Sequence, residues 1–351
     1  MNEMDYVKEY RHINRRKIVF GVTCIVLAVC IFVISIGIGQ YNVSFFESFN
    51  LFWEHLMGEN TSSMADNIVW NYRLPRLIMG FFGGMGLAVC GAVMQSIMRN
   101  PLADPYTMGI SSGASLGATL AIVMGISIIP STFGETSVIC NAFICSLIPL
   151  AIILIATRFK KVTPTTMILI GIAVMYVFGS TNTLMMVMAE PDDLADIYAW
   201  GVGTLGKADW TSVMVSIPVI SIATVFLIMA SKGINILSAG DSFSKTLGMR
   251  PERYRLVCFL VVALCTCTIV CFTGTIGFVG LVAPHVVRIF IGSNNQYLLP
   301  ITAVFGGLLL MGLDVISKMI SWNGLPVGVI CALVGGPMFI MVLIKQRKSA
   351  W

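Results

Sequence analysis

Residues 71–117 read NYRLPRLIMGFFGGMGLAVCGAVMQSIMRNPLADPYTMGISSGASLG, and their pattern indicates how the chain is organised. An apolar span follows the arginine pair Arg73 and Arg76, and a polar break at residues 99–105 separates it from a second apolar span. Small residues recur at every fourth position in both spans, which gives a helix a flat stripe for close packing inside a bilayer. We therefore expect two membrane helices that pack on each other and are joined by a sharp turn. The small residues are Gly80, Gly84, Ala88 and Ala92 in the first span and Gly109, Gly113 and Gly117 in the second.

The composition indicates a membrane protein throughout. Of the 351 residues, 57% are hydrophobic and 11% are charged, whereas a soluble domain carries about 25% charged residues. Apolar spans of about 20 residues, long enough to cross a bilayer, recur along the whole chain. The class is therefore an all-α polytopic membrane protein without a soluble domain. We expect ten transmembrane helices, at residues 18–38, 74–98, 106–125, 137–157, 164–188, 211–230, 254–272, 276–291, 298–320 and 326–344.

The basic residues orient these spans. With the N-terminus inside, 18 of the 22 Lys and Arg residues fall in inner segments, as the positive-inside rule requires. We therefore expect both termini in the cytoplasm, with tails at residues 1–17 and 346–351 and a single transmembrane domain at 18–345 in the cytoplasmic membrane. Because the basic residues cluster at span ends, nucleic-acid binding is not expected. The four outer exceptions are Arg73, Arg76, Lys207 and Lys318.

Little in the sequence favours catalysis or a metal site. The ten cysteines show no CxxC pair and lie mostly inside apolar spans, where Cys is small apolar filler. The three histidines, His12, His55 and His285, are expected to be surface or capping residues. Residues 201–207 resemble a P-loop, but Ala208 stands where that motif needs Ser or Thr for magnesium. We expect no enzyme activity, no metal site and no ATP bound by this chain.

Three polar segments predict short helices outside the spans. Residues 45–53 suit a short amphipathic outer helix, and the acidic outer loop at 190–196 is expected to be a solvated face with short helical character. The inner loop at about 232–252 is too short and too polar to cross the membrane. Gly240 predicts a break there between two short helices, with Asp241 or Ser242 capping the second.

An ion-coupled secondary carrier is an alternative from another class. Such carriers keep ionisable residues near mid-membrane to bind ions or protons. The acid within the expected spans is Asp314, which lies near an outer helix end, and Lys318 four residues later can pair with it. This pattern argues against ion coupling without excluding it.

Motifs in order along residues 65–345 resemble one family. RLPR, GAVMQ and RNPLADP lie in the opening stretch, and GTIGFVGLVAPH at 274–285, LPVGV at 325–329 and GGPMF at 335–339 follow. This series resembles the FecCD-type permeases, the membrane subunits of ABC importers for ferric siderophores, haem and vitamin B12. The resemblance implies a type II ABC importer permease architecture. It also implies import of a bulky metal chelate, a ferric siderophore first, with haem or a corrinoid as alternatives.

The resemblance further implies partners and site residues. The partners are a second, identical or paralogous permease, two ATPases that hold ATP and Mg²⁺, and an extracytoplasmic substrate-binding protein. Carboxylates of that binding protein would dock on Arg73, Arg76 and Lys318. The inner loop would be the ATPase coupling loop, and two inner segments would narrow the pathway as a gate. The coupling residues are Leu237, Gly240, Asp241, Lys245, Leu247 and Gly248, and the gate residues are Asn100, Leu102, Thr163 and Thr165.

Overall fold

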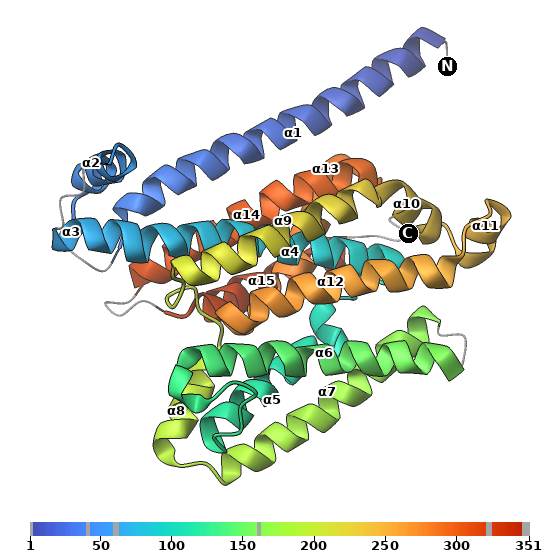
Figure 1. Cartoon of the computed structure of the whole chain (residues 1–351). Coiled ribbons are helices and arrows are strands. Elements are labelled where there is room, and N and C mark those ends of the chain that lie inside the picture. The colour runs from blue at the N-terminus through green and yellow to red at the C-terminus, as the bar shows by residue number, and fades with distance from the viewer. Residues whose placement is uncertain (1–2, 40–42, 59–62, 160–162, 321–324, 346–351) are drawn as a thin grey trace.

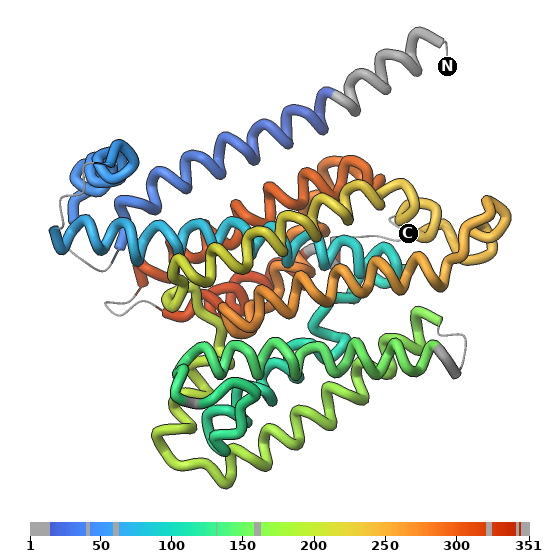
Figure 2. The backbone as a smooth tube through the Cα atoms, in the orientation of Figure 1, coloured from blue at the N-terminus to red at the C-terminus, as the bar shows by residue number. Residues whose placement is uncertain are grey.

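A computed structural model describes residues 3–39, 43–58, 63–159, 163–320 and 325–345 (Figures 1 and 2). Seven of its helices are long and apolar enough to cross a membrane, and three shorter apolar helices complete the expected ten. The predicted fold class is confirmed, whereas the expected tail at 346–351 lies outside the described residues. The ten helices are α1 (Glu3–Gly37), α4 (Leu74–Met98), α5 (Ile110–Val123), α6 (Glu135–Phe159), α7 (Pro164–Val187), α9 (Trp210–Met229), α12 (Pro251–Thr273), α13 (Val279–Ile291), α14 (Asn295–Ile320) and α15 (Val327–Lys345).

Shorter helices lie at both ends of the bundle. The outer helix predicted at 45–53 is present, and its first turn carries a capping box between Ser44 and Glu47. The acidic outer loop is also helical, as expected. Helix α1 starts at Glu3, well before the expected start of the span, because no Gly or Pro interrupts residues 3–17. The short elements are α2 (Phe45–Leu56), α3 (Met64–Asn67), η1 (Ile68–Arg73), η2 (Pro105–Met108), η3 (Ser131–Phe133), α8 (Pro191–Gly201), α10 (Ser231–Ser238) and α11 (Asp241–Thr246).

The helices form two groups that meet along α12. In the larger group, α4 packs against α9, α12, α13 and α14, while α1 lies on α14 at the edge. In the smaller group, α5 packs between α6 and α7, and α8 covers its outer end. Helix α12 contacts both α4 and α6 and so joins the groups (Figure 1). Helices α10 and α11 lie at the same end as the start of α1, in agreement with the expected orientation.

The two small-residue stripes pack closely, but not on each other. A side chain at Gly84 would strike the carbonyl of Gly306, which places the first stripe on α14. A side chain at Gly113 or Gly117 would strike backbone carbonyls of Cys145 or Asn141, which places the second stripe on α6. The expectation that α4 and α5 pack together is therefore wrong. The irregular segment 99–109 between them carries α5 away to the second group.

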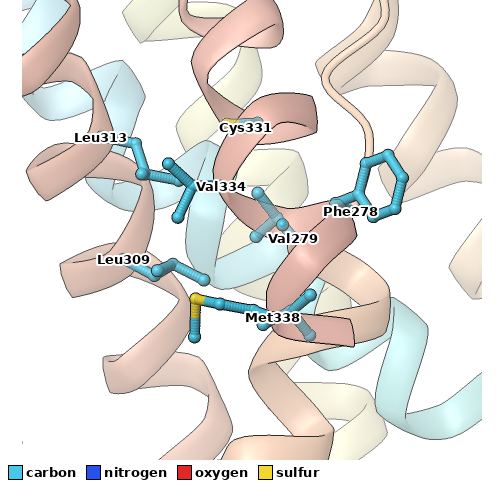
Figure 3. A pocket seen from close by; sticks show the side chains of 9 residues that line it. Phe278, Val279, Leu309, Leu313, Cys331, Val334 and Met338 are labelled. Carbon is cyan, nitrogen blue, oxygen red and sulfur yellow. The ribbon is translucent and has the colours of Figure 1, made fainter. Parts of the chain in front are cut away.

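Helix α13 is short because the backbone before it is irregular. Gly274 and Phe278 both have a φ of +67°, and α13 starts only at Val279. Gly274 and Ile276 are buried, and the amide of Thr204 donates to the carbonyl of Thr273, so protein contacts satisfy part of this irregular backbone. Side chains of α13, α14 and α15 leave an apolar cavity beside Phe278 of only about 10 Å³ (Figure 3). This space is the size of one water molecule, so it has no room for a cargo.

Candidate functional site

An ion cluster joins α4 and α14 at the outer end of the bundle. Arg76 Nη2 lies 2.8 Å from Asp314 Oδ1, and Arg76 Nε lies 3.0 Å from the same oxygen. Lys318 Nζ lies 2.9 Å from Asp314 Oδ2, so the expected Asp314–Lys318 pair is present. The side chains of Asp314 and Lys318 are only 3% and 4% exposed, and that of Arg76 is 15% exposed. Two cations thus share one buried carboxylate.

Arg73 is held by other elements. Its Nη1 donates to the carbonyl of Ile36 at 2.9 Å and to the hydroxyl of Ser48 at 2.8 Å. Ile36 lies in the last turn of α1, where the helix dipole is negative, and this offsets the cost of a cation at the start of α4. Contacts within the chain thus bury Arg73 and Lys318 and partly bury Arg76. Docking of a partner at these residues stays a prediction.

At the inner end, the loop breaks at Gly240 as predicted. Gly240 has a φ of +122° between α10 and α11, a conformation that L side chains rarely adopt. The expected capping by Asp241 or Ser242 is wrong, because Asp241 instead accepts a hydrogen bond from Arg255 Nη2 at 2.7 Å. Arg255 is buried on α12, and its Nε donates to the carbonyl of Ile97 on α4 at 3.0 Å. The start of α11 is therefore fastened to both α12 and α4.

A chain of amides fastens α10 as well. The Asn235 side chain accepts from the Asn295 amide at 2.8 Å and donates to Asn294 Oδ1 at 2.8 Å. The hydroxyl of Ser96 donates to Asn295 Oδ1 at 3.0 Å. Helix α10 is thus tied to the start of α14 and the end of α4, so a force on α10 reaches both helices.

The six predicted coupling residues divide into two sets. Leu237 and Gly240 are buried against the bundle, and Asp241 is half-buried. Lys245, Leu247 and Gly248 are exposed at the inner tip, as is the neighbouring Phe243. Leu247 and Phe243 are 57% and 51% exposed, which leaves two apolar side chains on a polar surface. One set holds the loop in place and the other is free to meet a partner.

The predicted gate residues lie in two separate segments. The Asn100 side chain accepts from the Leu102 amide at 2.9 Å, and Leu102 is half-exposed. Thr163 caps the start of α7 by accepting from the Thr166 amide at 3.2 Å, and Thr165 is exposed. The irregular segment meets α7 at Gly171, two turns beyond Thr163, where a side chain would strike the Met108 backbone. The gate stays a prediction.

Sequence reasoning missed a groove of about 330 Å³ between η2, α5, α7, the end of α8 and the connection before α13. It also placed His285 at a surface or cap, whereas the structure buries this residue on α13. Two polar runs inside apolar spans signalled the groove, namely Ser-Ser-x-x-Ser at 111–115 and Gly-Ser-Thr-Asn-Thr at 179–183. The groove is lined by Tyr106, Ser111, Ser112, Ser115, Gly179, Asn182, Gly201, Thr275 and Gly277.

Comparison with known proteins identifies the family. The model of the FecCD transport family matches residues 26–345. The chain belongs to the FecCD transport family. A Methanocaldococcus jannaschii protein named as an ABC transporter permease is 37% identical to this FecCD chain, over 98% of this chain and 99% of the relative. The iron(3+)-hydroxamate import permease of Bacillus subtilis is 30% identical, over 95% of this chain and 98% of the relative.

A solved structure supports the same assignment. It is described as an inward-facing conformation of a metal-chelate type ABC transporter and superposes with a TM-score of 0.81 at 27% identity. The match covers 93% of the FecCD chain and 99% of the solved chain. Other relatives are named as hemin, vitamin B12 and molybdate permeases. The FecCD chain is therefore a multi-pass protein of the cytoplasmic membrane, in a family of transport subunits.

Proposed function

We propose that this chain is the permease subunit of a binding-protein-dependent ABC importer that carries a bulky metal chelate into the cell. The supporting observation is the inner tip formed by α10 and α11. Phe243 and Leu247 are exposed at this tip, while hydrogen bonds of Arg255 and Asn235 hold its base against the bundle. An exposed apolar pair on a fixed base is suited to dock a partner and to transmit its movement. The proposed partners at this tip are two ATPase subunits, which bind ATP and Mg²⁺.

The working assembly we propose contains a second permease, identical or paralogous, and an extracytoplasmic binding protein. Arg76 and Lys318 lie at the outer end and share the single carboxylate of Asp314. A carboxylate of the binding protein that approaches this cluster would supply the second negative charge. Arg73, held by α1 and α2, would steady the same edge. Asn100, Leu102, Thr163 and Thr165 would narrow the inner end of the pathway.

The proposed cargo is a ferric siderophore, with haem or a corrinoid as alternatives. The support for iron comes from the Bacillus subtilis relative, which is named for iron(3+)-hydroxamate import. The support for the alternatives comes from relatives named for hemin and vitamin B12. In this proposal, the chelate crosses the cytoplasmic membrane intact.

Reconstitution tests this proposal. The chain is placed in vesicles with the ATPase and binding protein encoded beside it, and ATP hydrolysis is measured with a panel of loaded chelates. We expect a ferric siderophore on its binding protein to stimulate hydrolysis more than haem or vitamin B12. Phe243→Ser with Leu247→Ser should abolish ATPase co-purification while the permease stays folded. Lys207→Ser is the matched control, because Lys207 pairs with Glu135 at the opposite end. Full co-purification of the double variant would refute docking at the tip.

The alternative of an ion-coupled carrier lacks a specific observation in its favour. Asp314 is occupied by Arg76 and Lys318. The buried Asp104 caps η2 by accepting from the Tyr106 amide at 2.9 Å. Both carboxylates therefore have structural partners among the described residues.

A further inference from the structure

A cavity of about 390 Å³ lies at the inner end of the bundle, between the start of the membrane-spanning part of α1 and the end of α13. Its volume falls in the range of about 300–1,000 Å³ that small-molecule sites occupy. Helix α1 lies at the edge of the bundle on α13 and α14, so lipids of the inner leaflet can reach the cavity (Figure 1). The cavity is lined by Arg15, Arg16, Val19, Phe20 and Thr23 of α1 and by Phe290 of α13.

The α1 side of the cavity changes from charged to apolar toward the middle of the membrane. Arg15 lies about one helical turn before Val19, and Thr23 follows about one turn later, so the three side chains share one face. The Thr23 hydroxyl donates to the Val19 carbonyl at 2.8 Å, so its donor is already used. Phe20 stacks on Phe290 with ring centroids 4.5 Å apart, which adds an aromatic wall. A phospholipid has the same order of parts, with a charged phosphate at the surface and acyl chains below.

The basic residues at this cavity lack a counter-charge among the described residues. The lining contains no Asp or Glu, and no described carboxylate forms an ion pair with Arg15, Arg16 or Lys17. The Arg16 guanidinium instead lies over the Phe290 ring, 6.0 Å from its centroid. The Lys17 ammonium similarly lies 4.2 Å from the ring centroid of Tyr297 on α14. An anion between α1 and α13 would neutralise charge that the chain leaves unopposed.

The positive-inside rule alone does not account for this arrangement. That rule explains why basic residues gather at the inner end of α1, but it requires no cavity beside them. Two other inner arginines, Arg99 and Arg255, have a partner within the chain, because their Nη2 atoms lie 3.8 and 2.7 Å from Asp241 Oδ1. Arg15 and Arg16 combine unpaired charge with an apolar cavity between two helices. Basic pockets of this kind, on the cytoplasmic side of membrane helices, bind anionic lipid head groups.

We infer that this cavity binds an anionic phospholipid of the inner leaflet, with its phosphate between the guanidinium groups of Arg15 and Arg16. Guanidinium groups present forked N–H donors that match phosphate oxygens, so two adjacent arginines suit a phosphodiester. An acyl chain would lie along Val19 and Phe290. Only 17% of the most apolar stretch of α1 is buried, so the lipid would add contacts that hold the inner end of this helix on α13.

Lipid binding to the purified full chain tests the site, and it is measured without transport, so its outcome is separate from the proposed function. The chain in neutral detergent is titrated with phosphatidylglycerol or with phosphatidylcholine of the same acyl chains, and bound lipid is counted by native mass spectrometry. We expect wild type to bind phosphatidylglycerol about tenfold more tightly, and only this lipid should raise its unfolding temperature.

Two double variants separate this site from general surface charge. Arg15→Gln with Arg16→Gln should weaken phosphatidylglycerol binding about tenfold or more, because each cation near the head group contributes to its attraction. Arg250→Gln with Arg253→Gln is the matched control, because it removes two exposed inner arginines at the start of α12. This control should bind phosphatidylglycerol within about twofold of wild type.

A further variant keeps the basic residues that orient α1 in place. Val19→Trp puts an indole ring into the cavity, so it should also weaken phosphatidylglycerol binding. Equal binding of the two lipids by wild type, equal loss in the two double variants, or full binding by Val19→Trp would overturn the site. Displacement of the lipid by an equimolar amount of inorganic phosphate would show an anion site without lipid specificity, and this would overturn it as well.

Discussion

In the outer ion cluster, loss of the acidic side chain should destabilise the fold far more than loss of one basic side chain. Asp314→Asn removes the one carboxylate that Arg76 and Lys318 share, whereas Lys318→Met removes one of two cations and leaves a matched pair. We expect Asp314→Asn to destabilise the fold strongly and Lys318→Met to have little effect. A simple count of lost contacts would predict more similar losses in the free energy of unfolding, because both changes break the same Lys318–Asp314 bridge.

The structure sets the size of the difference. Asp314 is 2% exposed and binds Arg76 through both Nε and Nη2, so Asp314→Asn leaves two buried cations without a counter-charge. Breaking a buried pair from one side costs about 3–5 kcal/mol. Lys318→Met keeps the Arg76–Asp314 pair, fills similar space with an apolar side chain and loses a 3.3 Å contact to Ser35, at a cost of about 1 kcal/mol or less.

The assay is reversible unfolding in mixed detergent micelles, followed by circular dichroism, for both single variants and the double variant. The double variant should be less damaged than the sum of the singles, because Lys318→Met removes one of the two orphaned cations. Equal destabilisation by Asp314→Asn and Lys318→Met, or strict additivity in the double variant, would refute this charge-balance reasoning.

Further predictions concern packing, coupling, the gate and a helix cap. Gly91→Ala should destabilise by several kcal/mol, because its methyl group would strike the Gly280 carbonyl, whereas Gly179→Ala faces open space and should unfold like wild type. Gly240→Val should reduce uptake more than ATP hydrolysis, since valine resists a φ of +122°, and full uptake would remove Gly240 from the coupling loop. Leu102→Ala should raise ATP-independent chelate leak from vesicles, and an unchanged leak with normal transport would remove Leu102 from the gate. Asp209→Ala should cost about 1 kcal/mol by removing the cap of α9. Partial burial opposes ionisation of Asp209, but hydrogen bonds from Ser212 lower its pKa overall. The stability that ionised Asp209 contributes should therefore be fully present above the usual pKa of Asp and should disappear as the pH falls through the lowered pKa.

Helix positions were readable from the sequence because hydrophobic length and basic residues constrain them directly. All ten expected spans coincide with helices, and Gly240 marks the break between α10 and α11. The sequence could not reveal which helices touch. The stripes that contain Gly84 and Gly113 both predicted close helix packing, but such a stripe does not show which helix packs on it. The structure shows that these helices are α14 for Gly84 and α6 for Gly113.

The charged residues show the same limit. Sequence position placed Arg73 and Arg76 at the outer end of the bundle but did not reveal which residues contact them. The structure buries Arg73 against Ile36 and Ser48, residues of α1 and α2 that lie 37 and 25 positions away in the chain. Arg255 similarly counted only as an inner basic residue, although it joins α11, α12 and α4. Such contacts depend on tertiary packing, which hydropathy and charge patterns do not encode.

The driving force for uptake distinguishes an ATP-driven importer from an ion-coupled carrier. Vesicles that contain the permease, its ATPase and the loaded binding protein are supplied with ATP, with a proton gradient or with a sodium gradient, and entry of a labelled ferric siderophore is followed. We expect uptake only with ATP and only with the binding protein present. Uptake driven by either ion gradient without ATP would refute the importer assignment and would support an ion-coupled carrier instead.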